Sequence, residues 1–292
     1  MRHIPVLLHT VSDILTLSHG DVAVDATGGS GGHARMLAKK VGPSGTLLVL
    51  DQDGEAVARL TEVLAPYPQA QIRNANFRTI AQVAQECSLP PAQGILFDLG
   101  ISSEQIEESG RGFSFLRDEP LQMTLGAVGN DFTALDIINT WDESTLADII
   151  YGYGEEHAAR RIAQAIVVER RKAAIASSLV LATIVSNAKG GRHGRIHPAT
   201  KTFQALRIVV NDELGALEEG LSGAWSILAS QGRMAMITFH ALEARIVKRF
   251  LKEKKGEGSG TILTAHALRP TRDEVLSNPR ARSASLYALS KK

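Results

Sequence analysis

The 292-residue sequence contains one cysteine and no long apolar run. The single cysteine, Cys87, excludes an internal disulfide and a thiolate metal site, as is typical of a reducing compartment. No segment approaches the roughly 20 apolar residues that cross a bilayer, and the first residues lack the pattern of a secretory signal. No His, Asp and Cys cluster has metal-ligand spacing. We therefore expect a cytoplasmic globular protein without a membrane segment or a required metal.

Charge is distributed unevenly along the chain, although the formal net charge is only +1. Residues 104–156 contain twelve acidic and two basic residues, a charge of −10, whereas residues 157–207 contain ten Lys or Arg and one Glu, a charge of +9. Two interpretations stay open. The basic segment forms a surface that follows phosphate groups, or it pairs internally with the acidic segment. The candidate phosphate contacts are Arg160, Arg161, Arg170, Arg171, Lys172, Lys189, Arg192, Arg195 and Lys201.

The first hundred residues alternate β-rich apolar runs with helical patterns, which predicts βα units around a mostly parallel, doubly wound sheet. The expected strands are 22–27, 46–51, 71–77 and 94–100, and the expected helices lie near 31–41, 54–65 and 78–88. Helical patterns without a convincing strand follow until 232–239. A helix over 241–251 and closing strands over 261–268 and 283–289 come last. This order predicts two core segments, 1–104 and 201–292, around an inserted helical domain, 105–200.

A glycine-rich turn follows the first expected strand, in the sequence DATGGSGGHA from Asp25 to Ala34. Glycine allows positive φ and close approach of the backbone to a ligand at a helix N-terminus. Asp51 ends the second strand 23 residues after Gly28, where a carboxylate can accept hydrogen bonds from both hydroxyls of a ribose. The turn also fits G-x-G-x-x-A, so a nicotinamide dehydrogenase remains an alternative at this point.

The next two strand ends favour a methyltransferase. Asn76-Phe77 ends the third strand, where an aromatic ring can flank an adenine, and Asp98-Leu99-Gly100 ends the fourth, where a methyl group would be delivered. A dehydrogenase more often needs a proton-transfer group such as His or a Tyr/Lys pair there. Neither is present at these strand ends.

Uncommon strings in a fixed order then carry a family resemblance over essentially the whole chain. They are HIPVLL, DATGGSGGHA, DQD, DLGISSEQI, RGFSF, YGEEHAARRIAQAI, HPATKTFQALRIVVNDEL, FHALEARIVKRF and NPRARSASL. In this order they resemble the bacterial 16S rRNA cytosine-N4 methyltransferases, the RsmH or MraW family. The resemblance implies a class I (Rossmann-like) methyltransferase fold with a helical substrate-recognition domain inserted after strand four. It also implies contacts to S-adenosylmethionine from Gly31, Gly32, His33, Asp51, Phe77, Asp98 and Gln105.

The implied activity is methylation of the N4 amine of a cytosine in small-subunit rRNA, as naked RNA or in a ribosomal subunit. Asp98 is the first candidate for orienting that amine, with Ser102 and Ser103 second. The alternative is that Asp98 serves only the cofactor. Candidate substrate contacts are Phe113, Phe115, Phe239, His240, Arg192, Arg195 and Lys201. The phenylalanines could instead be core residues, and His240 could contact only a neighbouring carboxylate. A homodimer is an open alternative to a monomer.

Two segments depart from the family pattern. The chain has DEPLQMTL at 118–125 where the family typically reads DGPLDMRM, and FHALEAR at 239–245 where it reads FHSLEDR. Glu119, Gln122, Thr124, Ala241 and Ala244 are the altered positions. A catalytically altered rRNA-binding or assembly protein is therefore the second hypothesis, and an NAD-dependent oxidoreductase is the third.

Overall fold

The computed structural model describes residues 5–126, 132–191 and 196–292, which form two compact units. The first, here called the sheet unit, comprises Met1–Ile101 and Leu214–Lys292, and the second, the helical unit, comprises Ser102–Glu213. The helical unit is thus an insertion into the chain of the sheet unit. It includes the helix α10 (Thr200–Asn211), which the sequence assigned to the second core segment.

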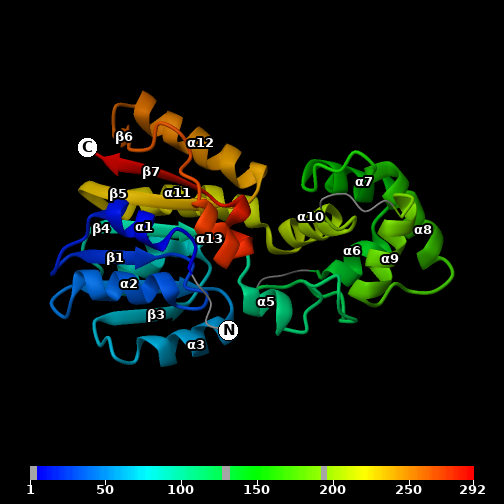
Figure 1. Cartoon of the computed structure of the whole chain (residues 1–292), viewed down its shortest axis with the longest axis horizontal. Helices are drawn as coiled ribbons and strands as arrows, with labels where there is room; N and C mark the ends of the chain where they lie inside the picture. The colour runs from blue at the N-terminus through cyan, green and yellow to red at the C-terminus, as the bar shows by residue number, and fades with distance from the viewer. Residues whose placement is uncertain (1–4, 127–131, 192–195) are drawn as a thin grey trace. The chain divides into compact units, whose positions relative to one another are not determined.

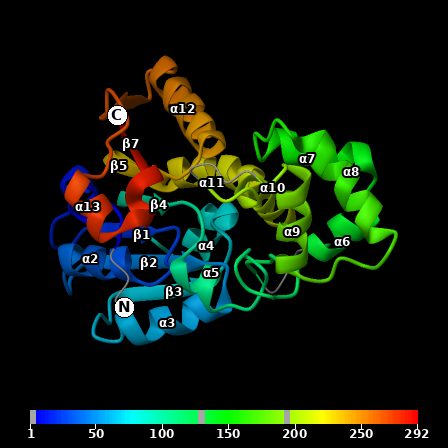
Figure 2. The same cartoon turned by 45° about the vertical axis from the view of Figure 1, so that its right-hand side comes forward.

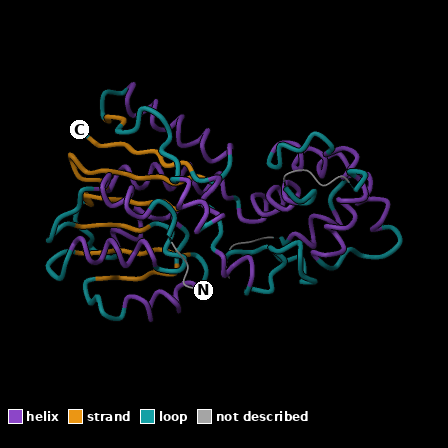
Figure 3. The backbone as a smooth tube through the Cα atoms, in the orientation of Figure 1, coloured by secondary structure: helices purple, strands orange, loops and turns teal. Residues whose placement is uncertain are grey.

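The sheet unit is built on one seven-stranded sheet, drawn as orange strands in Figure 3. Its strands are β1 (Val22–Asp25), β2 (Thr46–Asp51), β3 (Ala70–Asn74), β4 (Ala92–Asp98), β5 (Leu228–Thr238), β6 (Gly260–Ile262) and β7 (Ser285–Lys291). Their order is β3-β2-β1-β4-β5-β7-β6, as Figure 1 shows. Strands β1 to β5 pair in parallel, and β7 is antiparallel to both β5 and β6. The expected mostly parallel sheet is confirmed.

Helices cover both faces of this sheet because its strands are apolar on both sides. Leu47 and Val49 pack with α1, α2 and α3, whereas Leu48 and Leu50 pack with α4, α11 and α12. These two cores make the unit doubly wound. The helices are α1 (Leu8–Leu15), α2 (Gly32–Val41), α3 (Gly54–Leu64), α4 (Ile80–Glu86), α11 (Glu213–Ile227), α12 (Ala241–Gly256) and α13 (Arg272–Ser277), with short 3-10 helices η1 (Phe77–Thr79) and η2 (Pro279–Ser283).

Two expected strands are shorter in the structure. Strand β3 stops at Asn74, because the Asn76 side chain accepts a hydrogen bond from the Arg78 N–H and caps η1. Strand β6 ends at Ile262, and the rest of 261–268 joins the sheet through hydrogen bonds of Leu263 and Thr264 to Ala288 and an isolated bridge from Leu268 to Leu286. The expected pairing of the two closing segments is confirmed in antiparallel form.

The helical unit packs its helices around fully buried aliphatic side chains. The helices are α5 (Ser103–Glu107), α6 (Ala134–Thr140), α7 (Glu143–Gly152), α8 (Ala159–Arg170), α9 (Ser178–Ala188) and α10. α8 packs between α7 and α9, and α10 packs on α6 and α7 (Figure 2). Ile137, Leu146, Ile162, Ile166 and Leu181 are among its fully buried residues. Among the described residues, no helix has the length and apolar character needed to span a membrane.

Gly220 of α11 packs directly on Phe77, and this contact predicts an effect on stability. A Cβ at Gly220 would lie 2.7 Å from the Phe77 Cδ2 and 3.2 Å from the Phe77 carbonyl oxygen. Gly220→Ala is expected to lower the free energy of unfolding by roughly 1–2 kcal/mol, since overpacking outweighs the helix propensity of alanine. Gly256→Ala in α12 is the control, because a Cβ there meets nothing within 4 Å. Urea denaturation of both variants checks this, and a Gly220→Ala protein as stable as wild type would contradict it.

Candidate active site at the carboxyl edge of the sheet

The glycine-rich turn between β1 and α2 has no room for side chains at several positions. Gly29 and Gly31 have φ values of +52° and +81°, in the left-handed region that favours glycine. A Cβ at Gly28 would lie 2.5 Å from Leu60 Cδ1, and one at Gly32 would lie 2.2 Å from Pro5 Cγ. The turn therefore presents a bare backbone beside the N-terminus of α2, which is a suitable geometry for an anionic or polar ligand group.

Asp51 joins this turn to the end of β2. Its Oδ2 accepts a hydrogen bond from the Gly29 N–H at 2.8 Å, and its Oδ1 accepts one from the Asp53 N–H at 2.9 Å. Burial raises the pKa of Asp51, although these two hydrogen bonds act in the opposite direction. The carboxylate that the sequence singled out is thus held at the turn by backbone donors, and its remaining lone pairs stay available to a ligand.

Phe77 begins η1 and packs within the sheet unit. Its ring makes an edge-to-face contact with the fully buried Phe97, with centroids 5.7 Å apart, and also packs on Gly220. The Phe77 side chain remains partly exposed. Its position after β3 lies at the same carboxyl edge as Asp51, since β2 and β3 are parallel neighbours.

Asp25 and Asp98 form an acidic pair at the ends of the neighbouring strands β1 and β4, with Asp25 fully buried and the Asp98 side chain 20% exposed. Thr27 links their strands, because its N–H donates to Asp25 Oδ1 and its hydroxyl oxygen accepts from the Asp98 N–H. Burial raises the pKa of Asp25 to about 7. Burial, followed by the charges of Asp25 and Glu243, raises the pKa of Asp98 to about 8. Both groups hold a proton far more tightly than an exposed carboxyl does.

The second oxygen of each acid has no hydrogen-bond partner among the described residues. These atoms are Asp25 Oδ2 and Asp98 Oδ1. The other oxygen of Asp98, Oδ2, lies 3.5 Å from the Nε2 of His33, whose side chain is 6% exposed. Buried polar atoms without partners are costly, so this arrangement favours a ligand that supplies donors or positive charge.

Phe239, His240 and Glu243 lie after β5 and form the start of α12. The His240 Nδ1 accepts a hydrogen bond from the Glu243 N–H at 3.4 Å, and the His240 Nε2 lies 3.1 Å from Glu243 Oε1. Glu243 also accepts the Phe239 N–H at 2.7 Å. His240 is therefore the N-cap of α12 and contacts a neighbouring carboxylate, one of the two alternatives that the sequence left open. The partly exposed Phe239 packs against the core and beside Gly100.

Four other candidates lie in the helical unit. Ser102 and Gln105 form a capping box at the start of α5, in which each side chain accepts the backbone N–H of the other. Ser103 is the first residue of α5. Phe113 is 6% exposed, as expected of a core residue. The Arg111 Cζ lies 5.6 Å from the centroid of the Phe113 ring. Their roles in binding stay predictions.

The basic segment divides into inward-bonded and exposed cations. Lys189 Nζ lies 2.7 Å from Glu156 Oε2, and Lys201 Nζ donates to the Glu155 carbonyl at 2.7 Å. Arg170 donates to the Ile138 carbonyl, and Lys172 pairs with Glu169. Arg160, Arg161 and Arg171 are exposed, whereas Arg192 and Arg195 lie outside the described residues. Internal pairing thus accounts for part of the charge asymmetry.

The altered segments keep their local structure. Glu119 is buried, and its Oε2 accepts a hydrogen bond from the Gly112 N–H at 3.0 Å. Ala241 and Ala244 leave the His240–Glu243 capping box intact. Gln122 is exposed.

The order of the strands and the carboxyl edge of the sheet are those of a Rossmann-like methyltransferase fold. A protein of Streptococcus mutans, described as a methyltransferase and solved in complex with SAH, has the same fold with a TM-score of 0.51 and 12% identity, over 99% of this chain and 100% of that one. A family model described as the MraW methylase family matches residues 1–292. The chain belongs to the MraW methylase family.

Two relatives carry the name ribosomal RNA small subunit methyltransferase H. The one from Deinococcus radiodurans is 44% identical over 284 residues, which cover 97% of this chain and 88% of the relative. The one from Thermomicrobium roseum is 41% identical over 302 residues, which cover 98% and 92%. Both alignments include the sheet unit and the helical unit.

The sequence did not single out three residues of this edge as site residues: Asp25, Thr27 and Glu243. Asp25 stood within the glycine-rich motif, and Glu243 stood within FHALEAR. Their shared burial with Asp98 depends on strands β1, β4 and β5 being neighbours, which no local pattern reveals. An acidic residue at the end of an apolar strand was the signal available for Asp25.

The raised pKa of Asp98 predicts a pH dependence of stability. Between pH values of about 4 and about 8 the folded protein holds a proton that the unfolded chain has released, so the free energy of unfolding falls as the pH rises. Asp98→Asn is expected to reduce this fall by at least about 1 kcal/mol. The exposed Asp13→Asn is the control. Denaturant titrations at both ends of the range measure the difference, and an unchanged fall in Asp98→Asn would show that this carboxyl is not buried as described.

Proposed function

We propose that the protein transfers a methyl group from S-adenosylmethionine to the N4 amine of a cytosine in small-subunit rRNA. The observation that carries the proposal is the convergence of a bare glycine turn, Asp51 and the half-buried Asp98 at one edge of the sheet. Membership of the MraW methylase family and the names of the relatives support the reaction and the substrate. We propose that it acts in the cytoplasm on a small ribosomal subunit or its RNA.

The residues of the sheet unit fit this cofactor. S-adenosylmethionine carries an electrophilic methyl group on a positively charged sulfur, together with a ribose, an adenine and an amino acid end. Asp51 is assigned to the ribose hydroxyls, Phe77 to the adenine, and the backbone at Gly31 and Gly32 with His33 to the amino acid end. The unpartnered oxygens of Asp25 and Asp98 favour a cationic ligand, because it compensates buried negative charge. For Gln105, which lies in the helical unit, the cofactor contact stays a prediction from the family resemblance.

Cytosine N4 is a weak nucleophile because its lone pair is delocalised into the ring, so catalysis depends mainly on positioning. Asp98 is proposed to accept a hydrogen bond from the N4 amine and aim its lone pair in line with the methyl group. Bound S-adenosylmethionine would supply the methyl group, with the electrons of the broken S–C bond left on sulfur. Its positive charge would favour the ionised form of Asp98, and the Asp98 carboxylate would then stabilise the charge that develops on N4 and accept the departing proton.

The hydroxyls of Ser102 and Ser103 are second candidates for orienting the amine, although the Ser102 side chain caps α5. Phe239 and Phe113 are proposed at the substrate side, with Phe239 favoured because it is partly exposed whereas Phe113 is buried. His240 is assigned a supporting role, since its Nδ1 accepts the Glu243 N–H and cannot at the same time accept a substrate proton. Arg192, Arg195 and Lys201 stay proposed RNA contacts, with Lys201 bonded to Glu155.

Asp51 predicts a measurable loss of cofactor affinity. Asp51→Ala is expected to weaken S-adenosylmethionine binding by about 1.5–3 kcal/mol, because it removes hydrogen bonds to a charged acceptor. Asp51→Asn is expected to lose less, since its amide oxygen can still accept from the Gly29 N–H. Calorimetric titration measures both, with the exposed Asp13→Ala as control. Unchanged affinity in a folded Asp51→Ala protein would refute the ribose role, and binding of NAD in preference would refute the cofactor.

Methylation of ribosomal subunits tests the proposed reaction directly. Unmodified small subunits incubated with the protein and methyl-labelled S-adenosylmethionine are expected to gain N4-methylcytidine, which mass spectrometry of nuclease fragments locates. Asp98→Asn is expected to lower the turnover number at saturating cofactor by at least about 100-fold. Cofactor affinity is measured beside it, and a loss of affinity with normal turnover would assign Asp98 to the cofactor alone. Cofactor binding by wild type without labelling of any RNA would instead favour an assembly role.

A further inference from the structure

Two arginines of α8 and the arginine that caps its C-terminus lie on one exposed face in the helical unit. These residues, Arg160, Arg161 and Arg171, form no ion pair with another described residue. A helix turns about 100° per residue, which places Arg161 and Arg171 at about 100° and 20° from Arg160. The exposed Gln164 and Val168 lie within the same arc. The three guanidinium groups therefore form one stripe, here called the α8 stripe, about 16 Å long.

Among the described residues of α8, no acidic side chain lies within the arc of the α8 stripe. Glu169, the one acidic residue of the helix, lies about 180° from Arg160 and pairs with Lys172 at 2.7 Å. The neighbouring Lys189 and Lys201 are bonded inward to Glu156 and the Glu155 carbonyl. Lys189 and Lys201 thus bond to the acidic turn beside them. The positive charge of the α8 stripe is not neutralised by that turn and is available to an external partner.

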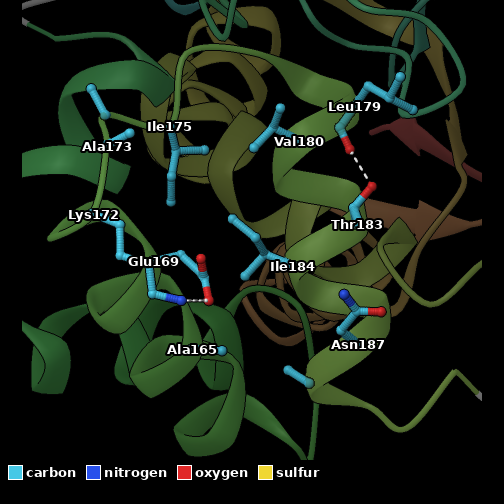
Figure 4. Close-up of a pocket in the computed structure, with 12 residues that line it drawn as sticks. Ala165, Glu169, Lys172, Ala173, Ile175, Leu179, Val180, Thr183, Ile184 and Asn187 are labelled. Carbon is cyan, nitrogen blue, oxygen red and sulfur yellow. Dashed lines mark hydrogen bonds and ion pairs between the residues drawn. The ribbon is translucent and has the colours of Figure 1, made fainter.

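A groove between α8 and α9 lies next to Arg161, the nearest member of the α8 stripe. It has a volume of about 670 Å³, and Ala165 of α8 lies in its wall at about 140° from Arg160 and about 40° from Arg161. Figure 4 shows Ile175, Val180 and Ile184 around the groove, with the ion pair of Glu169 and Lys172 on one side and Asn187 towards one end. Val180 is 48% exposed.

We propose that the α8 stripe and this groove bind a single-stranded stretch of the RNA substrate, with phosphates on the arginines and an unstacked base in the groove. The inference rests on the proposed function. It adds a surface that binds a part of the RNA other than the reacting base. Guanidinium groups bind phosphates through paired hydrogen bonds. Aliphatic walls contact the faces of a base, and the Asn187 amide offers a donor and an acceptor to its edge.

Charge complementarity favours RNA over a protein partner on this face. A peptide that covered the groove would need acidic residues spaced along about 16 Å of α8, whereas a nucleic acid strand carries a negative charge at every nucleotide. The two partners differ in the salt dependence of binding. Each phosphate contact on a single strand adds about 0.7 to the slope of log affinity against log salt.

The first test removes the α8 stripe. The triple variant Arg160→Gln, Arg161→Gln and Arg171→Gln is compared with Lys39→Gln, Lys252→Gln and Lys255→Gln, which removes the same charge from exposed lysines of the sheet unit. Fluorescence anisotropy with a labelled single-stranded RNA of mixed sequence is followed between about 50 and 200 mM salt. The stripe variant is expected to lower the salt slope by about 2, and the control variant to leave it unchanged.

The second test fills the groove without touching charge. Thr183 is exposed on α9 and lines the groove, so Thr183→Trp places an indole there, whereas Thr183→Ser leaves the groove open. Thr183→Trp is expected to weaken RNA binding several-fold at every salt concentration with an unchanged slope. Circular dichroism and melting temperature confirm that both proteins fold. Unchanged affinity for Thr183→Trp would overturn the base in the groove.

The outcomes separate this inference from the proposed function. Wild-type methylation of small subunits together with wild-type RNA binding by the stripe variant would overturn the inference and leave the function standing. RNA binding that depends on the α8 stripe without any methylation would support the surface and overturn the proposed reaction. Equal losses in the stripe and control variants would show only a response to net charge and would also overturn the inference.

Discussion

The placement of the buried Asp25 and the half-buried Asp98 at adjacent strand ends is the constraint on which the candidate site depends. Two acids at the carboxyl edge of a parallel sheet cannot both ionise without a compensating charge, and Glu243 adds a third acid close to Asp98. Thr27 holds the strand ends together by bonding to both residues. A protein keeps such a costly arrangement where a ligand or a reaction uses it.

The glycine turn supplies the complementary half of the same edge. Gly28 and Gly32 leave no space for a Cβ, so the first turn of α2 lies close to β2 and to Pro5 near the start of the chain. Asp51 then fixes the turn from the side through the Gly29 N–H. One side of the edge thus carries backbone donors and the other carries carboxyl groups, and a ligand that has both an anionic and a cationic end matches this polarity.

Much of this edge could be predicted from the sequence, because strand ends and glycine turns are local signals. Asp51 and Asp98 follow apolar runs, and both occupy the expected strand ends. The acidic pair was not predictable, since it depends on β1 and β4 being neighbours. The length of β3 was overestimated because the side-chain cap at Asn76 competes with strand pairing. The contact of His240 with Glu243 could be seen only from the distance between its ring and that carboxylate, and a contact with the base stays a prediction.

The charge asymmetry shows why a count of charges along a chain leaves two interpretations open. In the helical unit both are true of different residues. Lys189 and Lys201 bond to the acidic turn at Glu155 and Glu156, whereas Arg160 and Arg161 of α8 face outward. Helical periodicity decides which residue does which. α8 buries Ile162 and Ile166 against its neighbours, so residues on the opposite arc must face solvent whatever their charge. The position of Arg161 beside the groove between α8 and α9, rather than the total charge, is the observation behind the proposed binding surface.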